Sequence, residues 1–290
     1  MAHLAPVEKG IGFVKSIVKI AAFIFVFAAV ITSIHFGGLF LFEKDPEILA
    51  HHGVGQVTFY LLFILNVFLF QKYVNRQSVV SLGLKRYPGW PVTVFKGWLA
   101  GGIAFLGYVF LMSLFGIVEL RVDSWTKFWL NFPVALMVAC AAFGIALTED
   151  VLFRGFFFQT LLQNVPKWPS IVITGIIFGF FHKLNQPLDF FTLPYDAMLF
   201  GGVFCLNVLL CFAFLKSGTL YLPIGIHSGL VFAKIACKKL KFIHVLQSDS
   251  FLFGLGGDPR RGFFAWGLFL AGIFILQFLI SSREPKVSHD

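Results

Sequence analysis

The sequence has 290 residues, of which 58% are hydrophobic and 13% are charged, with a mean hydropathy of +0.85 and a formal net charge of +9. Soluble domains average about 45–50% apolar and about 25% charged residues, so this composition excludes a soluble enzyme, a disordered chain, collagen and a coiled coil. The basic residues are scattered between hydrophobic stretches, which indicates membrane topology and anionic lipid headgroups, not nucleic acid.

Hydrophobic stretches of about 20 residues predict the membrane spans. Each is expected to be a helix, because backbone polar groups in hydrocarbon must be satisfied within the segment. We therefore predict an all-α polytopic membrane protein, one integral membrane domain over residues 1–290 with about eight transmembrane helices; the buried polar cavity that these helices are expected to enclose is implied by the family resemblance described below. The predicted spans are 20–42, 53–70, 97–118, 128–148, 168–182, 196–215, 219–236 and 263–281.

The basic residues also predict an orientation. The N-terminal segment and the 71–96 connection are basic, and the 43–52 loop is acidic, which favours a cytoplasmic N-terminus. The basic 238–262 connection then falls on the opposite side, so either a span is miscounted or part of this segment lies along the interface. Within it, Gly254–Arg261 is glycine-rich but matches no phosphate-binding motif and is interpreted as a turn.

Ionisable residues inside apolar stretches are costly and are functional candidates. Glu149, Asp150 and Arg154 interrupt the run from Phe128 to Leu162. Asp150 and Arg154 are four residues apart and can form an ion pair on one helix face. Glu149 points about 100° away, without a local partner, and suits a general acid or base. Alternatively, all three residues form an ion-pair cluster that pins two helices together.

Two histidines lie in the spans that follow. His182 ends the segment Phe178-Gly-Phe-Phe-His182 and precedes Asn185, and His227 lies in the middle of an apolar span. A lone histidine at either position would more often be a packing residue. Two histidines together with a carboxylate cluster indicate a site.

In this order, the segments 149–154, 178–182 and 227–231 resemble the CPBP family of intramembrane proteases (CAAX processing and bacteriocin self-immunity proteins, also called the Abi family). That family carries EExxxR, FxxxH and HxxxN on successive membrane helices. The resemblance covers residues 149–231 and implies a core over 128–236 with a buried catalytic cavity. It also implies cleavage of a membrane-associated protein or peptide, with or without a lipid modification, and no nucleic-acid partner. The expected location is the plasma membrane of a prokaryote or the endoplasmic reticulum of a eukaryote.

The resemblance assigns a role to each matching residue. Glu149 stands for the first motif glutamate, which activates the water. Asp150 replaces the second glutamate and keeps a carboxylate able to pair with Arg154. His182 stands for the histidine that helps to hold the water, and His227 for the residue that stabilises the oxyanion.

Val231 departs from the family pattern, because the motif has asparagine there. Valine has no donor, and loss of one oxyanion donor costs about 10²–10³ in rate. Asn185, Asn207 or a backbone N–H can compensate; the protease can be slow; or the chain can be an impaired member acting as a membrane adaptor or immunity protein. We favour an active or weakly active protease, because the other motif residues are present together.

The need for a metal stays open at this point. Glu149, His182 and His227 could ligate zinc, as catalytic zinc sites use three protein ligands and a water. The chain contains no HExxH motif, and we favour a glutamate-type protease without an obligate metal over a metalloprotease. A transporter that uses the same charges as a proton relay is a third class, but the sequence shows no internal repeat.

Overall fold

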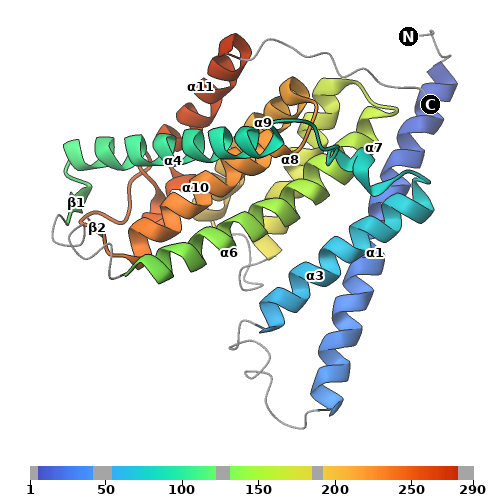
Figure 1. The fold of residues 1–290 in the computed structure, drawn as a ribbon, viewed down its shortest axis with the longest axis horizontal. Coiled ribbons are helices and arrows are strands. Elements are labelled where there is room, and N and C mark those ends of the chain that lie inside the picture. Colours follow the sequence, from blue (N-terminus) through green and yellow to red (C-terminus); the bar gives the residue numbers. More distant parts are fainter. Residues whose placement is uncertain (1–5, 42–53, 122–130, 185–191, 280–290) are drawn as a thin grey trace. The chain divides into compact units, whose positions relative to one another are not determined.

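The computed structural model describes residues 6–41, 54–121, 131–184 and 192–279 (Figure 1). Contacts divide the chain into two compact units. One comprises Met1–Leu82 with Val151–Ser170, and the other comprises Gly83–Asp150 with Ile171–Asp290. The expectation of one domain over residues 1–290 stays a prediction.

The first unit has a core of phenylalanine rings. Its elements are α1 (Pro6–Leu41), α3 (Val54–Leu69), the π-helix η1 (Phe70–Val74), the 3-10 helix η2 (Val79–Leu82), the π-helix η4 (Val151–Phe158) and α7 (Gln159–Leu162). Phe23 is fully buried and packs edge-on against Phe63, Phe70 and Phe157, with ring centroids between 5.3 and 6.2 Å apart. Such pairs contribute about 0.5–1.5 kcal/mol each beyond their buried area.

The second unit contains the larger set of helices and a short pair of strands. The two strands, Val118–Leu120 and Ile243–Val245, pair antiparallel, with Glu119 opposite His244. They are a small exception to the all-α prediction. The elements are α4 (Trp90–Leu114), β1 (Val118–Leu120), α6 (Phe132–Asp150), α8 (Lys167–Leu184, from Ile171 onward in this unit), α9 (Tyr195–Ser217), α10 (Tyr221–Lys239), β2 (Ile243–Val245), the 3-10 helices η5 (Leu255–Gly257) and η6 (Pro259–Arg261), and α11 (Phe263–Leu279).

Helix α10 runs through the middle of this unit, between α4 and α6 (Figure 1). Glycines four residues apart, Gly97 and Gly101 on α4 and Gly225 and Gly229 on α10, face each other across the contact. A Cβ added at Gly229 would lie 2.1 Å from the carbonyl oxygen of Trp98. Small residues at this spacing let membrane helices approach with their backbones almost in contact.

Helix α6 packs antiparallel to α10. Ala135 and Val138, near the start of α6, form an apolar cluster with Ala236 and Leu240, near the end of α10. The carboxyl end of α6 therefore lies beside the first half of α10.

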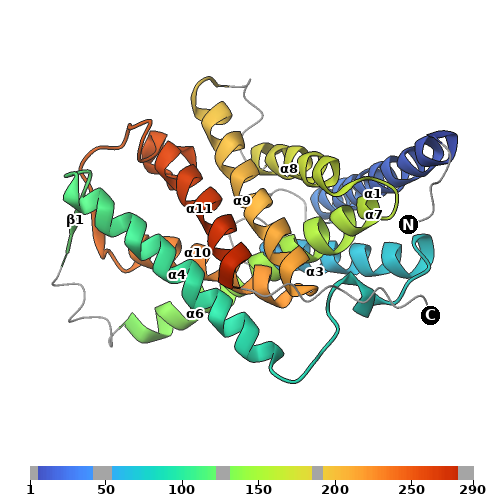
Figure 2. The ribbon, with the colours of Figure 1, turned by 90° about the horizontal axis from the view of Figure 1, so that it is seen from above.

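Helices α8 and α9 are also antiparallel and are joined at both ends. The Asn207 amide donates to the carbonyl of Ile171 at 3.1 Å, and Lys183 forms an ion pair with Asp196 at 2.8 Å. Figure 2 shows α11 beside α9, where Gly272 contacts Leu209 closely enough that a Cβ would lie 3.1 Å from its side chain. These contacts fix the end of α8 that carries the second motif.

Each of the eight predicted spans overlaps a helix of the structure. Among the described residues, four helices are long and apolar enough to cross a membrane: Gly10–Ser33, Trp90–Leu114, Phe132–Leu162 and Tyr195–Ser217. Helix α10 falls outside this set, because it carries polar and basic side chains. Its first half is buried by neighbouring helices, so it needs no apolar face toward lipid.

Candidate active site

The two adjacent carboxylates end α6. The Glu149 side chain is 19% exposed, and the Asp150 side chain is fully buried. The helix continues beyond them as the π-helix η4. Widened turns of this kind are rare and often occur at functional sites, because they turn side chains away from their α-helical directions.

His227 of α10 lies between these two carboxylates. Its Nδ1 is 3.4 Å from Asp150 Oδ2, and its Nε2 is 3.8 Å from Glu149 Oε2. The ring is 4% exposed, so both interactions take place away from bulk water. A protonated His227 would donate from Nδ1 to Asp150 and would present Nε2–H on the side of Glu149.

His182, in the last turn of α8, has a different environment. Its Nδ1 lies 3.0 Å from the carbonyl oxygen of Phe178, and the Phe178 ring packs edge-on at 4.5 Å. A carbonyl can only accept, so this contact assigns the proton to Nδ1 and leaves Nε2 as an acceptor. His182 interacts electrostatically with both Glu149 and His227, so the three predicted catalytic residues come together.

One oxygen of the Glu149 carboxylate is among the buried polar atoms without a hydrogen-bond partner in the described part of the chain. Oε2 is buried and has no hydrogen-bond partner there. Leaving a buried acceptor unsatisfied costs about 1–3 kcal/mol or more, so such groups require an explanation. A carboxylate oxygen in this position can accept a hydrogen bond from a bound water and then take its proton.

The comparisons with known proteins bear on this same region. Residues 129–233 match the family model described as Type II CAAX prenyl endopeptidase Rce1-like. This match assigns the region to the CPBP/CAAX protease family. No curated protein and no solved structure matched the chain. With its apolar helices, the chain is an all-α, polytopic integral membrane protein, and its residues 129–233 are similar to a family of proteases.

The other predicted residues, which support the three catalytic ones, lie in different parts of the chain. Arg154 belongs to the first unit, where its side chain is fully buried and stacks near the Phe153 ring, so its ion pair with Asp150 stays a prediction. Val231 lies one turn after His227 on α10 and is half-buried. Asn185 lies outside the described residues. The amide of Asn207 already donates to α8, as described above.

The fit to a metal ion can be judged from the ligand groups. Among the residues that the structure describes, no group of three or more His, Cys, Asp or Glu side chains is arranged to hold a metal ion. Both ring nitrogens of His227 instead lie close to carboxylate oxygens, Nδ1 to Asp150 and Nε2 to Glu149. We therefore derive no step through a metal.

Sequence reasoning missed charged residues close to this site. Lys234 follows His227 by seven residues on α10, and Arg260 interacts electrostatically with Glu149 and His182. The seven-residue spacing could have indicated Lys234, because positions i and i+7 share a helix face. No local signal indicated Arg260, which is brought to the site by the fold of the 238–262 connection.

Proposed function

We propose that this protein is an intramembrane endopeptidase that uses Glu149 as the base for the attacking water. The observation that carries the proposal is the buried Glu149 Oε2, which has no hydrogen-bond partner among the described residues and faces His227 Nε2 at 3.8 Å. A base and an acid are thereby held together in a site that excludes most water. That is the arrangement amide hydrolysis requires.

The proposed reaction uses both groups in sequence. Glu149 takes a proton from the water, whose oxygen bonds to the carbonyl carbon of the scissile amide. The carbonyl oxygen becomes an oxyanion and accepts a hydrogen bond from His227 Nε2–H. Glu149 then gives its proton to the amide nitrogen, the C–N bond breaks, and an acid and an amine leave. Protons and charges balance without an added cofactor.

The neighbours have positioning roles in this proposal. Asp150 accepts from His227 Nδ1 and so holds the imidazole with Nε2 toward the oxyanion. His182 has its Nδ1 engaged with Phe178, so its Nε2 accepts from the same water and aims a lone pair of the water oxygen at the substrate. A fixed orientation of this kind lowers the entropy cost of the attack.

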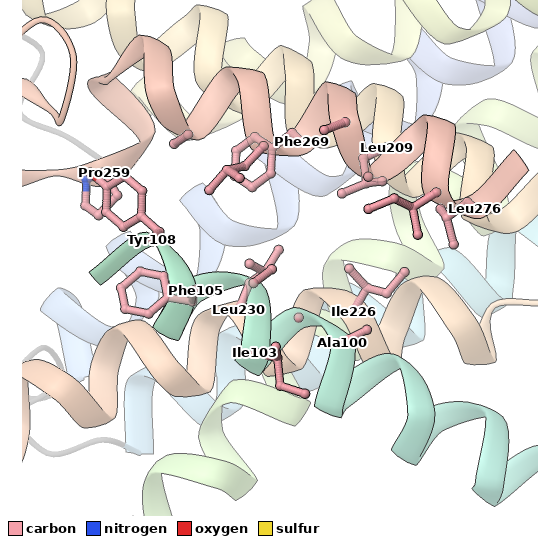
Figure 3. Close-up of a pocket in the computed structure, with 17 residues that line it drawn as sticks. Ala100, Ile103, Phe105, Tyr108, Leu209, Ile226, Leu230, Pro259, Phe269 and Leu276 are labelled. Carbon is pink, nitrogen blue, oxygen red and sulfur yellow. The ribbon is translucent and has the colours of Figure 1, made fainter. Parts of the chain in front are cut away.

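An apolar pocket next to α10 supports the proposal that the substrate carries a lipid modification. The pocket has a volume of about 390 Å³, within the usual range for ligand pockets. Figure 3 shows Leu209 and Phe269 on one side and Phe105, Ile226 and Leu230 on the other. Ile226 directly precedes His227 on α10, so the pocket is lined by a face of this helix about 100° from that of His227. We propose that this pocket holds a prenyl chain of the substrate.

A test of the pocket uses Ala104→Trp, which fills part of its volume. We expect KM for a farnesylated peptide to rise about 10-fold, and KM for the same peptide without the lipid to stay unchanged. An equal effect on both peptides would argue against lipid binding at this position.

The test of the reaction is cleavage of a farnesylated, fluorescence-quenched peptide by purified protein in proteoliposomes. Glu149→Gln keeps the shape of the side chain and removes the base, so we expect cleavage to fall by at least about 10³-fold. Glu119→Gln is the matched control, since Glu119 is an exposed acid of β1. Chelation of divalent metals should leave the wild-type rate unchanged; loss on chelation with recovery on added zinc would favour the metalloprotease.

A second candidate function is that of a membrane adaptor or immunity protein, because Val231 replaces the asparagine of the motif. Such a protein would bind its partner without cleaving it. It would show the same cellular phenotype with Glu149→Gln as with the wild-type residue, whereas a protease would lose its phenotype.

A further inference from the structure

A surface of basic side chains lies on the first unit. Every charged side chain that the structure describes in this unit is basic: Lys15, Lys19, Lys72, Arg76, Arg154 and Lys167. Arg154 is fully buried and Lys19 is half-buried, whereas the others are exposed. Within the described side chains of the unit, no carboxylate is available to pair with these cations.

Hydrogen bonds tie together the three segments that carry the cations. Ser16 on α1 donates to the backbone carbonyl of Thr160 on α7 at 3.0 Å, and Asn164, which follows α7, donates to the Ser16 hydroxyl at 3.0 Å. The amide of Asn75, the residue after η1, donates to the Thr160 hydroxyl at 3.3 Å. The exposed cations lie next to these residues or within a few positions of them along the chain: Lys15, Lys72, Arg76 and Lys167. The fold therefore gathers them at one end of the unit.

Helices α1 and α3 run antiparallel away from this end. The Phe23 ring packs on Phe70 at 5.3 Å and the Phe27 ring packs on Phe63 at 4.5 Å, so later residues of α1 meet earlier residues of α3. Beyond the cations, the described parts of both helices are uncharged and expose large apolar side chains. The basic surface thus lies at the end of a hydrophobic helix pair, where the headgroups of a bilayer would meet it.

Two exposed aromatic side chains belong to the same end. Tyr73 is 66% exposed and Trp168 is 61% exposed, and the Lys72 ammonium lies 5.3 Å from the centre of the Tyr73 ring. Tyrosine and tryptophan are enriched at the level of lipid headgroups, because their rings are apolar at one end and polar at the other. They favour a lipid surface over water as the neighbour of these cations.

Arg76 has a backbone conformation that is unfavourable for its residue type. Its φ is +54°, in the left-handed region, where a side chain is strained and glycine is the usual residue. The following N–H, of Gln77, donates to the carbonyl of Gln71 at 3.0 Å and closes this turn. An arginine kept at a position that suits glycine indicates that its exposed guanidinium is used.

We propose that the basic surface formed by Lys15, Lys72, Arg76 and Lys167 binds the phosphodiester groups of acidic phospholipids. Clustered lysines and arginines at a membrane surface attract anionic headgroups, and the absence of a carboxylate among the described side chains leaves their charge for the lipid. The surface would hold the first unit to the headgroup layer. This inference is independent of the proposed protease activity.

The test measures thermal unfolding of purified protein in dodecylmaltoside micelles with added dioleoyl-phosphatidylglycerol or dioleoyl-phosphatidylcholine. A ligand that binds the folded state raises the melting temperature, and we expect phosphatidylglycerol to act on wild-type protein at a concentration at least about 10-fold lower than phosphatidylcholine. Arg76→Gly removes the charge and relieves the strained φ, so the variant should fold and bind phosphatidylglycerol about fivefold more weakly. Lys72→Gln should weaken binding to a similar extent.

Lys241→Gly is the matched control, because Lys241 is an exposed cation of the second unit with a φ of +55°. It undergoes the same change of charge and backbone freedom and should keep the wild-type preference for phosphatidylglycerol. Equal stabilisation of wild-type protein by the two lipids would overturn the inference. So would equal losses in Arg76→Gly and Lys241→Gly, since net charge alone would then be responsible.

A soluble headgroup distinguishes a lipid surface from a site for a free phosphate ester. Glycerophosphoglycerol carries the same phosphodiester without acyl chains, and we expect it to leave the melting temperature of wild-type protein unchanged. Stabilisation by this compound at the concentrations at which the lipid acts would reject binding to a lipid surface.

Discussion

The contact between α4 and α10 leaves no room for a side chain at Gly229. Adding one methyl group there therefore tests whether this contact positions the active site. In Gly229→Ala the new Cβ would lie 2.1 Å from the Trp98 carbonyl oxygen. Carbon atoms in proteins essentially never approach within 3.0 Å of such an atom, so the helices must separate by about 0.9 Å. Both partners are backbone, so no side-chain rotation can relieve the clash.

This separation moves His227, which precedes Gly229 by two residues on α10. Misplacing a catalytic group by about 1 Å can cost about 10²-fold in rate. We therefore expect kcat to fall about 100-fold in Gly229→Ala, with a loss of about 1–3 kcal/mol in stability from overpacking.

The assay is peptide cleavage in proteoliposomes, with thermal unfolding of the same preparation to show that the variant is folded. Gly107→Ala on α4 is the matched control, because a Cβ there meets no atom within 4 Å. A folded Gly229→Ala protein with kcat within about threefold of wild type would refute the reasoning, since it would show that the close contact does not position His227.

Three further predictions concern the site and its surroundings. Val231→Asn should raise kcat about 10-fold in steady-state cleavage, because it adds a donor one turn from His227; an unchanged kcat would show that no oxyanion donor is missing. Asp150→Asn should lower kcat at least about 10-fold with little change in KM, since the His227 imidazole loses the carboxylate that orients it. A comparable rise in KM would indicate a role in substrate binding. Burial alone would raise the pKa of Asp258, but Lys234 and the neighbouring guanidinium outweigh it and hold this pKa below its ordinary range. Asp258→Asn should therefore lower the melting temperature, and this decrease should have its full size above about pH 4. The difference from the wild-type protein should shrink as the pH falls through the lowered pKa of Asp258. A difference that does not depend on pH would contradict the ion-pair role.

The amino-acid sequence by itself determined the class of protein and the catalytic candidates. Apolar stretches long enough to span a bilayer predict helices, since no other open structure satisfies its backbone there. Every such stretch overlaps a helix of the structure. Against that apolar background, Glu149, His182 and His227 stand out because a buried ionisable group is costly. That cost is local and can be recognised without knowledge of the fold.

Only the tertiary structure decided how these residues meet and what lies next to them. It put His227 between two carboxylates, and it brought Arg260 to the site from a segment that the sequence indicated only as a turn. The charge of the 238–262 connection is thus partly paired within the protein, through Arg260 and Asp258, and is not all a signal of topology. Periodicity and hydropathy report the surroundings of each segment. Which segments touch depends on side-chain packing between helices, such as the glycine contact of α4 with α10, and that information is spread over residues more than a hundred positions apart.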